Sequence, residues 1–273
     1  MTSSVQALEQ HLKDLHAVIY EEKKGSILNP TSIISDINDF CARLSKDEYS
    51  LASSLIFDEK EGLFAFVNKS LDSYASDKTM SLARKASFDF ILNYIKQADS
   101  QIADYAVTIK KWSLNAFRRD ESNVVKHAAL QPIIRLIQQD YPQVTTQSFD
   151  IKNTFQILFR EFSRGKPGAV VKGALLELLG IITEHFPGEC HTQGNQLLEA
   201  YMDTLQTQSQ KPNPEMQLIA SSFKGLSYFL SQFGGSIEEG SDYIKPLYGY
   251  LCKALELVNA TRHDASKCNI FDF

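Results

Sequence analysis

The stretch "LARKASFDFILNYIKQ", residues 82–97, decides the fold class. Its apolar residues recur every three or four positions, which places them on one broad face of a helix. They are Leu82, Phe88, Ile91, Leu92 and Ile95. Alternation of apolar and polar residues, the pattern of a half-buried strand, is nearly absent from the rest of the chain. The sequence therefore predicts an all-α protein.

The helical pattern recurs along the chain, and each occurrence is followed or preceded by a second helical segment. The stretches that share the pattern are 124–139, 170–186 and 218–233, and the partner segments are 102–117, 149–162, 195–206 and 242–258. Proline and glycine separate the segments, as in "YP" at 141–142 and "FPG" at 186–188. Such residues end helices and form the turns between them.

The repeat has a period. An apolar–x–apolar–apolar motif begins at Phe88, Leu130, Leu176 and Leu226, at intervals of 42, 46 and 50 residues. Two helices per period of about 40–47 residues are typical of HEAT or armadillo repeats. The sequence predicts an α-solenoid of irregular HEAT-like helix pairs, and an irregular globular helical domain is the alternative. Residues 1–75 would be N-terminal helices capping the solenoid, 76–260 about four helix pairs, and 261–273 the start of a further repeat.

A dense apolar window, "SSLIFDEKEGLFAFVNKSLDS" at residues 53–73, needs a separate explanation. It predicts two short helices, 48–57 and 62–74, with a break at 58–62. Its apolar residues are too dense for a helix with one buried stripe. We expect an element covered on two sides, between N-terminal helices near 3–22 and 30–45 and the repeat that begins near residue 77.

Composition limits the function classes. The chain has 273 residues, 43% hydrophobic, with a net charge of −5. Its four cysteines show no CxxC pair, which favours a reducing compartment over a disulfide framework. No apolar run approaches the roughly 20 residues of a membrane span, and the N-terminus lacks a signal-peptide pattern. These features predict a cytosolic or nuclear protein without a membrane partner.

The charges are distributed unevenly between the predicted turns. Turns inside helix pairs carry an excess of acidic residues, whereas turns between pairs carry an excess of basic ones. A basic edge of this kind could follow a phosphate backbone without reading bases. The candidate phosphate contacts are Arg118, Arg119, Lys126, Arg160, Arg164, Lys166 and Lys211. On the acidic edge, the candidates for contact with a protein partner are Glu238, Glu239 and Asp242. The alternative is that these charges are ordinary solvated turn residues.

Motifs of catalysis are absent from the sequence, and neither a cofactor nor a metal is expected. The glycine-rich loop, H-R-D and D-F-G of protein kinases are missing. "SRGKPG" at 163–168 lacks the first glycine and the Ser/Thr of a phosphate-binding loop, so a helix-connecting turn is the better interpretation. "HFPGECH" at 185–191 lacks metal-ligand spacing, although a small helical enzyme that uses His185 and His191 is a rival hypothesis. Lys110 and Lys111 lie beside Trp112, but at mid-helix positions where burial of the indole is expected.

Several segments together resemble a known family. They are "SSLIFDEKEGLFAFVNKSLDS" (53–73), "YAVTIKKW" (105–112), "LLELLGIITEHFP" (175–187) and "SSFKGLSYFLSQFGGSIEE" (221–239). In order and spacing they are similar to the extreme N-terminus of the family of DNA-dependent protein kinase catalytic subunits, within the phosphatidylinositol 3-kinase-related kinases. The similarity runs from about residue 50 to 260, and residues 1–45 match weakly.

The resemblance implies a function for the segment. It would be the non-catalytic, nuclear N-terminal scaffold of a giant serine/threonine kinase that acts in double-strand break repair by non-homologous end joining. Its partners would be double-stranded DNA ends, the Ku heterodimer and the remainder of the kinase chain. Because the chain stops at Phe273 in "SKCNIFDF", we expect a fragment with the kinase domain beyond it. A general HEAT or armadillo-type adaptor, which binds peptide on its inner helices, is the alternative.

Overall fold

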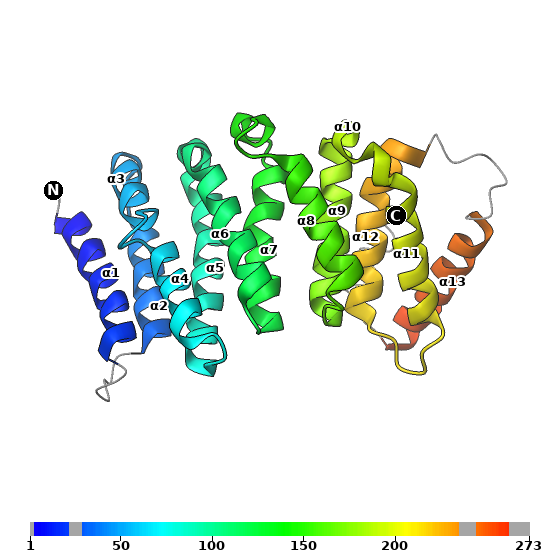
Figure 1. Ribbon diagram of the computed structural model, residues 1–273, viewed down its shortest axis with the longest axis horizontal. Coiled ribbons are helices and arrows are strands. Elements are labelled where there is room, and N and C mark those ends of the chain that lie inside the picture. Colours follow the sequence, from blue (N-terminus) through cyan, green and yellow to red (C-terminus); the bar gives the residue numbers. More distant parts are fainter. Residues whose placement is uncertain (1–2, 22–28, 235–243, 262–273) are drawn as a thin grey trace. The chain divides into compact units, whose positions relative to one another are not determined.

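The computed structural model describes residues 3–21, 29–234 and 244–261 (Figure 1). All regular structure in these ranges is helical, which confirms the predicted all-α class. The chain forms two compact units, Met1–Phe149 and Asp150–Phe273. The predicted division at residues 75 and 260 stays a prediction. In the described ranges, every helix is too short or too polar to cross a bilayer.

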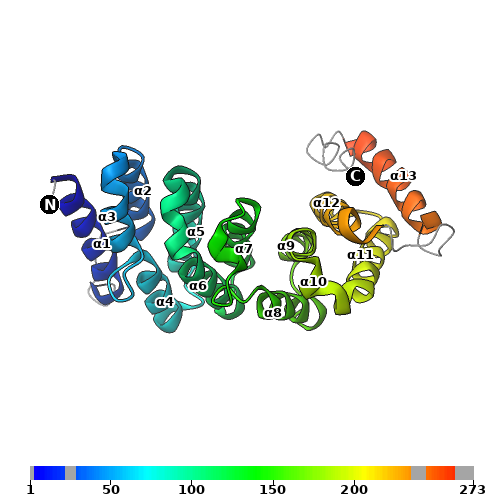
Figure 2. The same cartoon turned by 90° about the horizontal axis from the view of Figure 1, so that it is seen from above.

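The first unit is a series of helices that lie side by side (Figure 2). They are α1 (Ser3–Glu21), α2 (Pro30–Cys41), α3 (Lys46–Ile56), α4 (Leu63–Tyr74), α5 (Lys78–Ala98), α6 (Ala106–Arg119) and α7 (Asn123–Gln138). Short 3-10 turns η2 (Asp99–Tyr105) and η3 (Pro142–Thr145) accompany them. Helix α5 packs against both α2 and α7, and α6 packs against α7. The unit is therefore built from contacts between helices that are near in sequence.

The dense apolar window forms two short helices, as predicted. Helix α3 ends at Ile56, and α4 begins at Leu63 after a turn in which Asp58 accepts backbone N–H groups. The apolar side chains of the window are buried: Ile56, Phe57, Leu63, Phe64, Phe66, Val67 and Leu71. Helix α4 contacts α1 on one side and α5 and α6 on the other. The window is thus an element covered on two sides.

One residue of the stretch that decides the fold class departs from expectation. Phe88, Ile91 and Ile95 are buried, but Leu82 is 51% exposed. Leu82 lies in the first turns of α5, where Met80 and Ala83 are buried, so neighbouring helices do reach this end of the helix. At about 100° per residue, Leu82 lies at least about 120° around the helix from Phe88, Ile91 and Ile95, and it therefore points away from the packed face.

A buried ion pair joins α5 to the end of α4 and to the turn between α6 and α7. Arg84 Nε on α5 donates to Asp120 Oδ2 at 2.6 Å, and both side chains are fully buried. The guanidinium also donates to the carbonyl oxygens of Tyr74 and Ala75 at the end of α4. Asp120 Oδ1 in turn accepts the backbone N–H of Ser122, at the start of α7. Arg84 therefore satisfies carbonyls that a helix end leaves without intrahelical partners.

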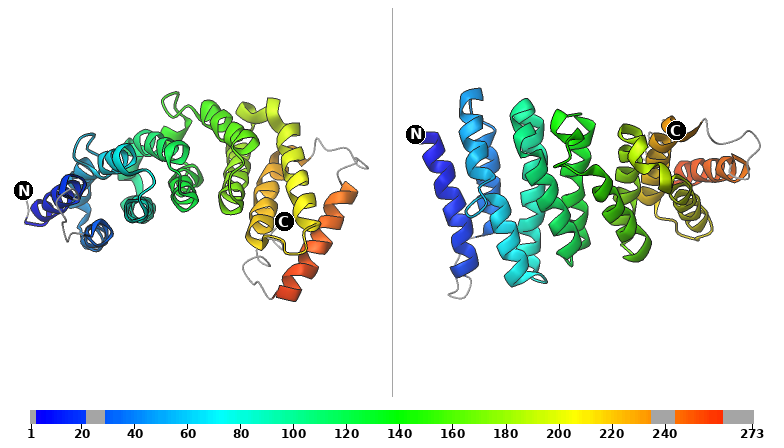
Figure 3. Two further views of the ribbon diagram at one scale, coloured as in Figure 1. Left: turned by 60° about the horizontal axis from the view of Figure 1, so that its bottom comes forward. Right: turned by 45° about the horizontal axis from the view of Figure 1, so that its top comes forward.

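The second unit contains α8 (Ile151–Arg164), α9 (Ala169–His185), α10 (Pro187–Cys190), η4 (His191–Gln193), α11 (Gly194–Ser209), α12 (Met216–Phe233) and α13 (Ile244–Thr261) (Figure 3). Helices α9 and α12 approach most closely at two glycines. A Cβ atom on Gly180 would lie 2.2 Å from the carbonyl oxygen of Gly225, and a Cβ on Gly225 would lie 2.5 Å from the carbonyl oxygen of Leu176. Both positions therefore require glycine.

Candidate nucleic-acid interface

In the first unit, the predicted basic residues lie around the α6–α7 turn. Arg118 and Arg119 end α6, and Lys126 lies in the first turn of α7. Arg119 forms an ion pair with Asp72 at the end of α4, so its charge is largely compensated. Arg118 is exposed and Lys126 half-buried, and the described residues place no carboxylate in ion-pair contact with either. Of the three predicted cations in the first unit, Arg118 and Lys126 have no ion-pair partner among the described residues, and Arg119 has one.

In the second unit, four predicted basic residues are exposed. Arg160 and Arg164 lie one turn apart on α8, Lys166 lies in the α8–α9 turn, and Lys211 lies in the α11–α12 turn. In the part of the chain that the structure describes, none of the four forms an ion pair. Both turns lie at the same end of the unit, the lower end in Figure 1. These residues form the basic cluster of the second unit.

Lys172 on α9, which lies outside the predicted turns, extends this positive region. Its ammonium nitrogen lies 5.3 Å from the ring centroid of Phe162. Burial lowers the pKa of Lys172, and the nearby charge of Lys211 lowers it further, whereas Asp203 raises it. A like charge acts this way only at short range, so Lys172 and Lys211 contribute to one local potential.

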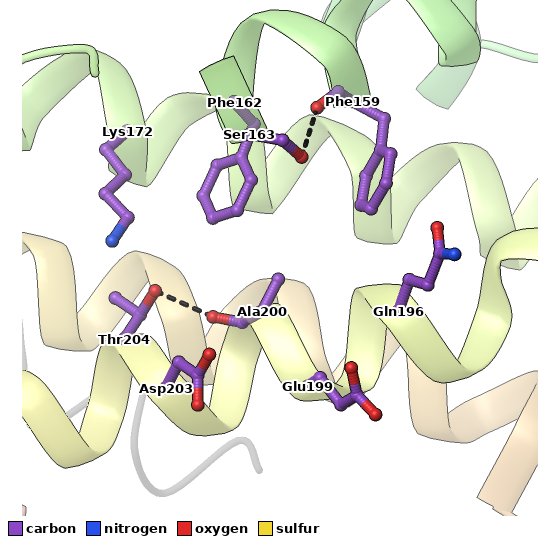
Figure 4. A pocket seen from close by; sticks show the side chains of 9 residues that line it. All are labelled: Phe159, Phe162, Ser163, Lys172, Gln196, Glu199, Ala200, Asp203 and Thr204. Carbon is purple, nitrogen blue, oxygen red and sulfur yellow. Dashed lines mark hydrogen bonds between the residues drawn. The ribbon is translucent and has the colours of Figure 1, made fainter. Parts of the chain in front are cut away.

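A groove lies between α8 and α11 in the second unit, shown in part in Figure 4. Two adjoining hollows of about 420 and 340 Å³ share Phe159, Ser163 and Gln196 in their walls. Phe155 and Phe159 stack in its base with ring centroids 6.0 Å apart. The three aromatic residues of "FQILFREF" indicate an aromatic face on α8, but which helix lies opposite, and so the groove itself, follows only from the fold.

The basic residues beside Trp112 have structural roles. Lys110 is buried, and its ammonium donates to the carbonyl oxygen of Phe149. The indole of Trp112 stacks on Phe64 with ring centroids 6.0 Å apart. Lys111 is exposed beside the indole. The indole packs against α4, but the expected burial is incomplete, because Trp112 is only half-buried.

The histidines of "HFPGECH" point to different neighbours. His185 closes α9 and lies beside Phe186, whereas His191 contacts Phe233 of α12. Cys190 is fully buried, and burial raises the pKa of its thiol to about 12. Within the described ranges, no three His, Cys, Asp or Glu side chains are close enough to hold a metal ion. The predicted acidic candidates Glu238, Glu239 and Asp242 lie outside the described residues.

Comparison with known families assigns the chain. A family model described as "DNA-PKcs, N-terminal" matches residues 50–270. The chain belongs to the DNA-PKcs N-terminal family. The matched range contains every predicted basic residue and the whole groove between α8 and α11. The resemblance inferred from four sequence segments is therefore confirmed.

Relatives of this DNA-PKcs region come from distant organisms. The chain is 29% identical over 223 residues to the DNA-dependent protein kinase catalytic subunit of Dictyostelium discoideum and 28% identical over 229 residues to that of Xenopus laevis. It is 28% identical over 209 residues to the mouse protein of the same name. These alignments cover 76–82% of the chain but about 5% of each relative. The chain thus corresponds to a non-catalytic part of such a kinase.

Proposed function

We propose that this chain is the N-terminal scaffold of a DNA-dependent serine/threonine protein kinase and contacts DNA ends through the phosphate backbone. The basic cluster of the second unit carries the proposal. Arg160, Arg164, Lys166 and Lys211 are exposed and lack carboxylate partners within the described residues, so their charge is available to phosphates. Contacts of this kind position a protein on DNA without reading sequence.

The proposal extends to architecture and partners. The α-solenoid of HEAT-like helix pairs is supported by the family assignment and by successive helices packing against near neighbours in each unit. The names of the relatives support membership of a DNA-dependent kinase. From this membership we also propose two partners, the remainder of the kinase chain and the Ku heterodimer. We further propose a nuclear location and a role in non-homologous end joining.

The test is the affinity for a short blunt-ended DNA duplex, measured across a salt series. We compare the natural chain with a variant that carries R160E, R164E, K166E and K211E. Log affinity falls with log salt by about 0.9 for each phosphate neutralised. The variant should bind more weakly, and its slope should be smaller by that amount for each phosphate that it no longer neutralises.

A matched control separates a local interface from net charge. The variant R43E, K96E, K152E and K253E reverses the same number of exposed basic residues outside the cluster. It should keep most of the affinity and the slope. Equal losses in both variants would show that only net charge matters, and unchanged binding in the cluster variant would refute the proposed contacts.

A protein-binding adaptor is the second candidate function. The observation that favours it is the groove between α8 and α11, whose aromatic base and charged walls suit a polypeptide. An adaptor would tolerate the loss of the basic residues in the turns, Lys166 and Lys211, because neither lines the groove.

A further inference from the structure

The groove between α8 and α11 arises from the packing of the helices behind it. Helix α8 packs against α9, and α11 packs against α12. Gly180 and Gly225 bring α9 and α12 into backbone contact. No glycine pair of this kind joins α8 and α11, both of which the structure describes in full, and their facing side chains leave the two adjoining hollows. The groove therefore lies between two helices that are each held by a different partner, α8 by α9 and α11 by α12.

The base and the walls of the groove differ in chemistry. Phe155, Phe159 and Phe162 of α8 present aromatic surface, and the last two are only half-buried (Figure 4). Gln196 and Ala200 of α11 face them. The base is thus an apolar surface of limited width, bounded by polar side chains.

The rows of charged residues on α8 and α11 have opposite sign, and Lys172 of α9 lies near Asp203 in the same hollow. Glu199 and Asp203 lie one turn apart on α11, and both are exposed. Arg160 and Arg164 lie one turn apart on α8. Neither the carboxylates nor the guanidinium groups form an ion pair within the described ranges. Side chains four residues apart on a helix share one face, so each wall presents a row of two like charges.

We propose that this groove binds an amphipathic helix of a protein partner, with an apolar stripe between one basic flank and one acidic flank. The basic flank would lie along Glu199 and Asp203, and the acidic flank along Arg160 and Arg164. The wall of α11 from Gln193 to Thr204 is about 16 Å long at 1.5 Å per residue, which matches three turns of a bound helix. Recognition of an apolar helix face by an apolar groove is a common mode of peptide binding.

Charge complementarity selects a helix over a nucleic acid in this groove. A phosphate backbone would gain from Arg160 and Arg164 but would be repelled by Glu199 and Asp203 on the other wall. A helix with two unlike flanks satisfies both walls at once, and charge pairing of this kind fixes which partner is accepted. The groove shares Arg160 and Arg164 with the DNA contacts proposed above, whereas Lys166 and Lys211 lie outside it and Glu199 and Asp203 belong to the groove alone.

The test uses synthetic labelled peptides and fluorescence anisotropy with the whole chain. The main probe is a helical peptide with a leucine stripe, lysines on one flank and glutamates on the other. It should bind at least about tenfold more tightly than peptides that carry lysine on both flanks or glutamate on both, since each tenfold step is a difference of about 1.4 kcal/mol. A peptide with serine in place of leucine should not bind.

Charge exchange on the protein makes the test specific. E199K/D203K should weaken binding of the main probe about tenfold and should strengthen binding of the glutamate-flanked peptide. The control E189K/E256K makes the same change in net charge at exposed positions outside the groove and should leave both affinities unchanged. F159A/F162A should abolish binding of the main probe while circular dichroism retains the helical signal.

Three outcomes would overturn the proposal. The first is equal affinity for all leucine-stripe peptides, and the second is an E199K/D203K variant that behaves like its control. The third is that the chain binds single-stranded oligo(dT) but not the peptide, and that F159A/F162A loses the binding of oligo(dT). This result would assign the aromatic rings to base stacking. Failure of the DNA contacts proposed above would appear separately, because E199K/D203K removes no cation.

Discussion

Removing Asp120 should destabilise the first unit by about 3–5 kcal/mol, the range observed when one partner of a buried ion pair is deleted. In D120N the guanidinium of Arg84 stays fully buried and keeps the carbonyl oxygens of Tyr74 and Ala75, at 3.1 and 2.8 Å. The negative charge and one of the two acceptor oxygens are lost, so either Arg84 Nε or the backbone N–H of Ser122 loses its partner, and any bond that Arg84 keeps is to a neutral amide. A hydrogen bond to a charged group contributes about 1.5–3 kcal/mol, and the uncompensated buried charge adds to the loss.

The assay is urea unfolding followed by tryptophan fluorescence. Trp112 is the one tryptophan in the sequence and stacks on Phe64, so its emission reports on the first unit. With a slope of about 2 kcal/mol per M, the unfolding midpoint of D120N should fall by about 1.5–2.5 M. R84M should show a loss of similar size, and R84M/D120N should lose less than the sum of the single variants.

A pair on the same helix serves as the control. Lys85 and Asp89 form an exposed ion pair on α5, and exposed pairs contribute about 0–1 kcal/mol. D89N should therefore shift the midpoint by less than about 0.5 M at the same slope. If D120N lost no more stability than D89N, the proposed role of the buried pair in holding α5 to the end of α4 and to the α6–α7 turn would be wrong.

Two further predictions concern a close helix contact and a buried histidine. G180A should destabilise the second unit by at least about 2 kcal/mol, because the added Cβ meets the backbone of Gly225. The control G188A, whose Cβ would meet nothing within 4 Å, should change thermal stability by less than about 1 kcal/mol. Equal melting temperatures of the two variants would show that α9 and α12 can separate. Burial lowers the pKa of His16, whose Nε2 lies 3.1 Å from the carbonyl oxygen of Gly62, so folding favours the neutral ring. Stability from this group is present above the unfolded pKa of about 6.5 and is lost as pH falls below it. H16Q should flatten the loss of stability between pH 7.5 and 5, measured by tryptophan fluorescence, and an unchanged pH profile would contradict the role of His16.

Much of the helical architecture follows from local sequence. The break between Ile56 and Leu63 was predictable because Asp58 and Gly62 favour a turn between two apolar runs. Exposure of Leu82 was predictable from helix geometry, because at about 100° per residue it lies at least about 120° around α5 from Phe88, Ile91 and Ile95. Burial of Arg84 was not predictable, because it depends on Asp120, which is distant in sequence and meets it only in the fold.

The exposure of the predicted basic residues follows from local sequence, whereas their ion pairs do not. Arg160, Arg164, Lys166 and Lys211 are exposed, as residues of turns and helix ends usually are. Arg119 differs because Asp72 lies beside it at the neighbouring helix end. The sequence around neither residue indicates this ion pair, because the two residues are 47 positions apart.

The sequence by itself determined the helical class, the break between α3 and α4 and the family, because periodicity, turn residues and segment order are properties of the linear chain. Tertiary structure decided which charges are free and where a groove opens. Glycine contact between α9 and α12 leaves a hollow between α8 and α11, and it brings Phe159 opposite Ala200. Such juxtapositions depend on the distances between helix axes. The sizes of the side chains across a whole interface set these distances, and no local sequence pattern encodes them.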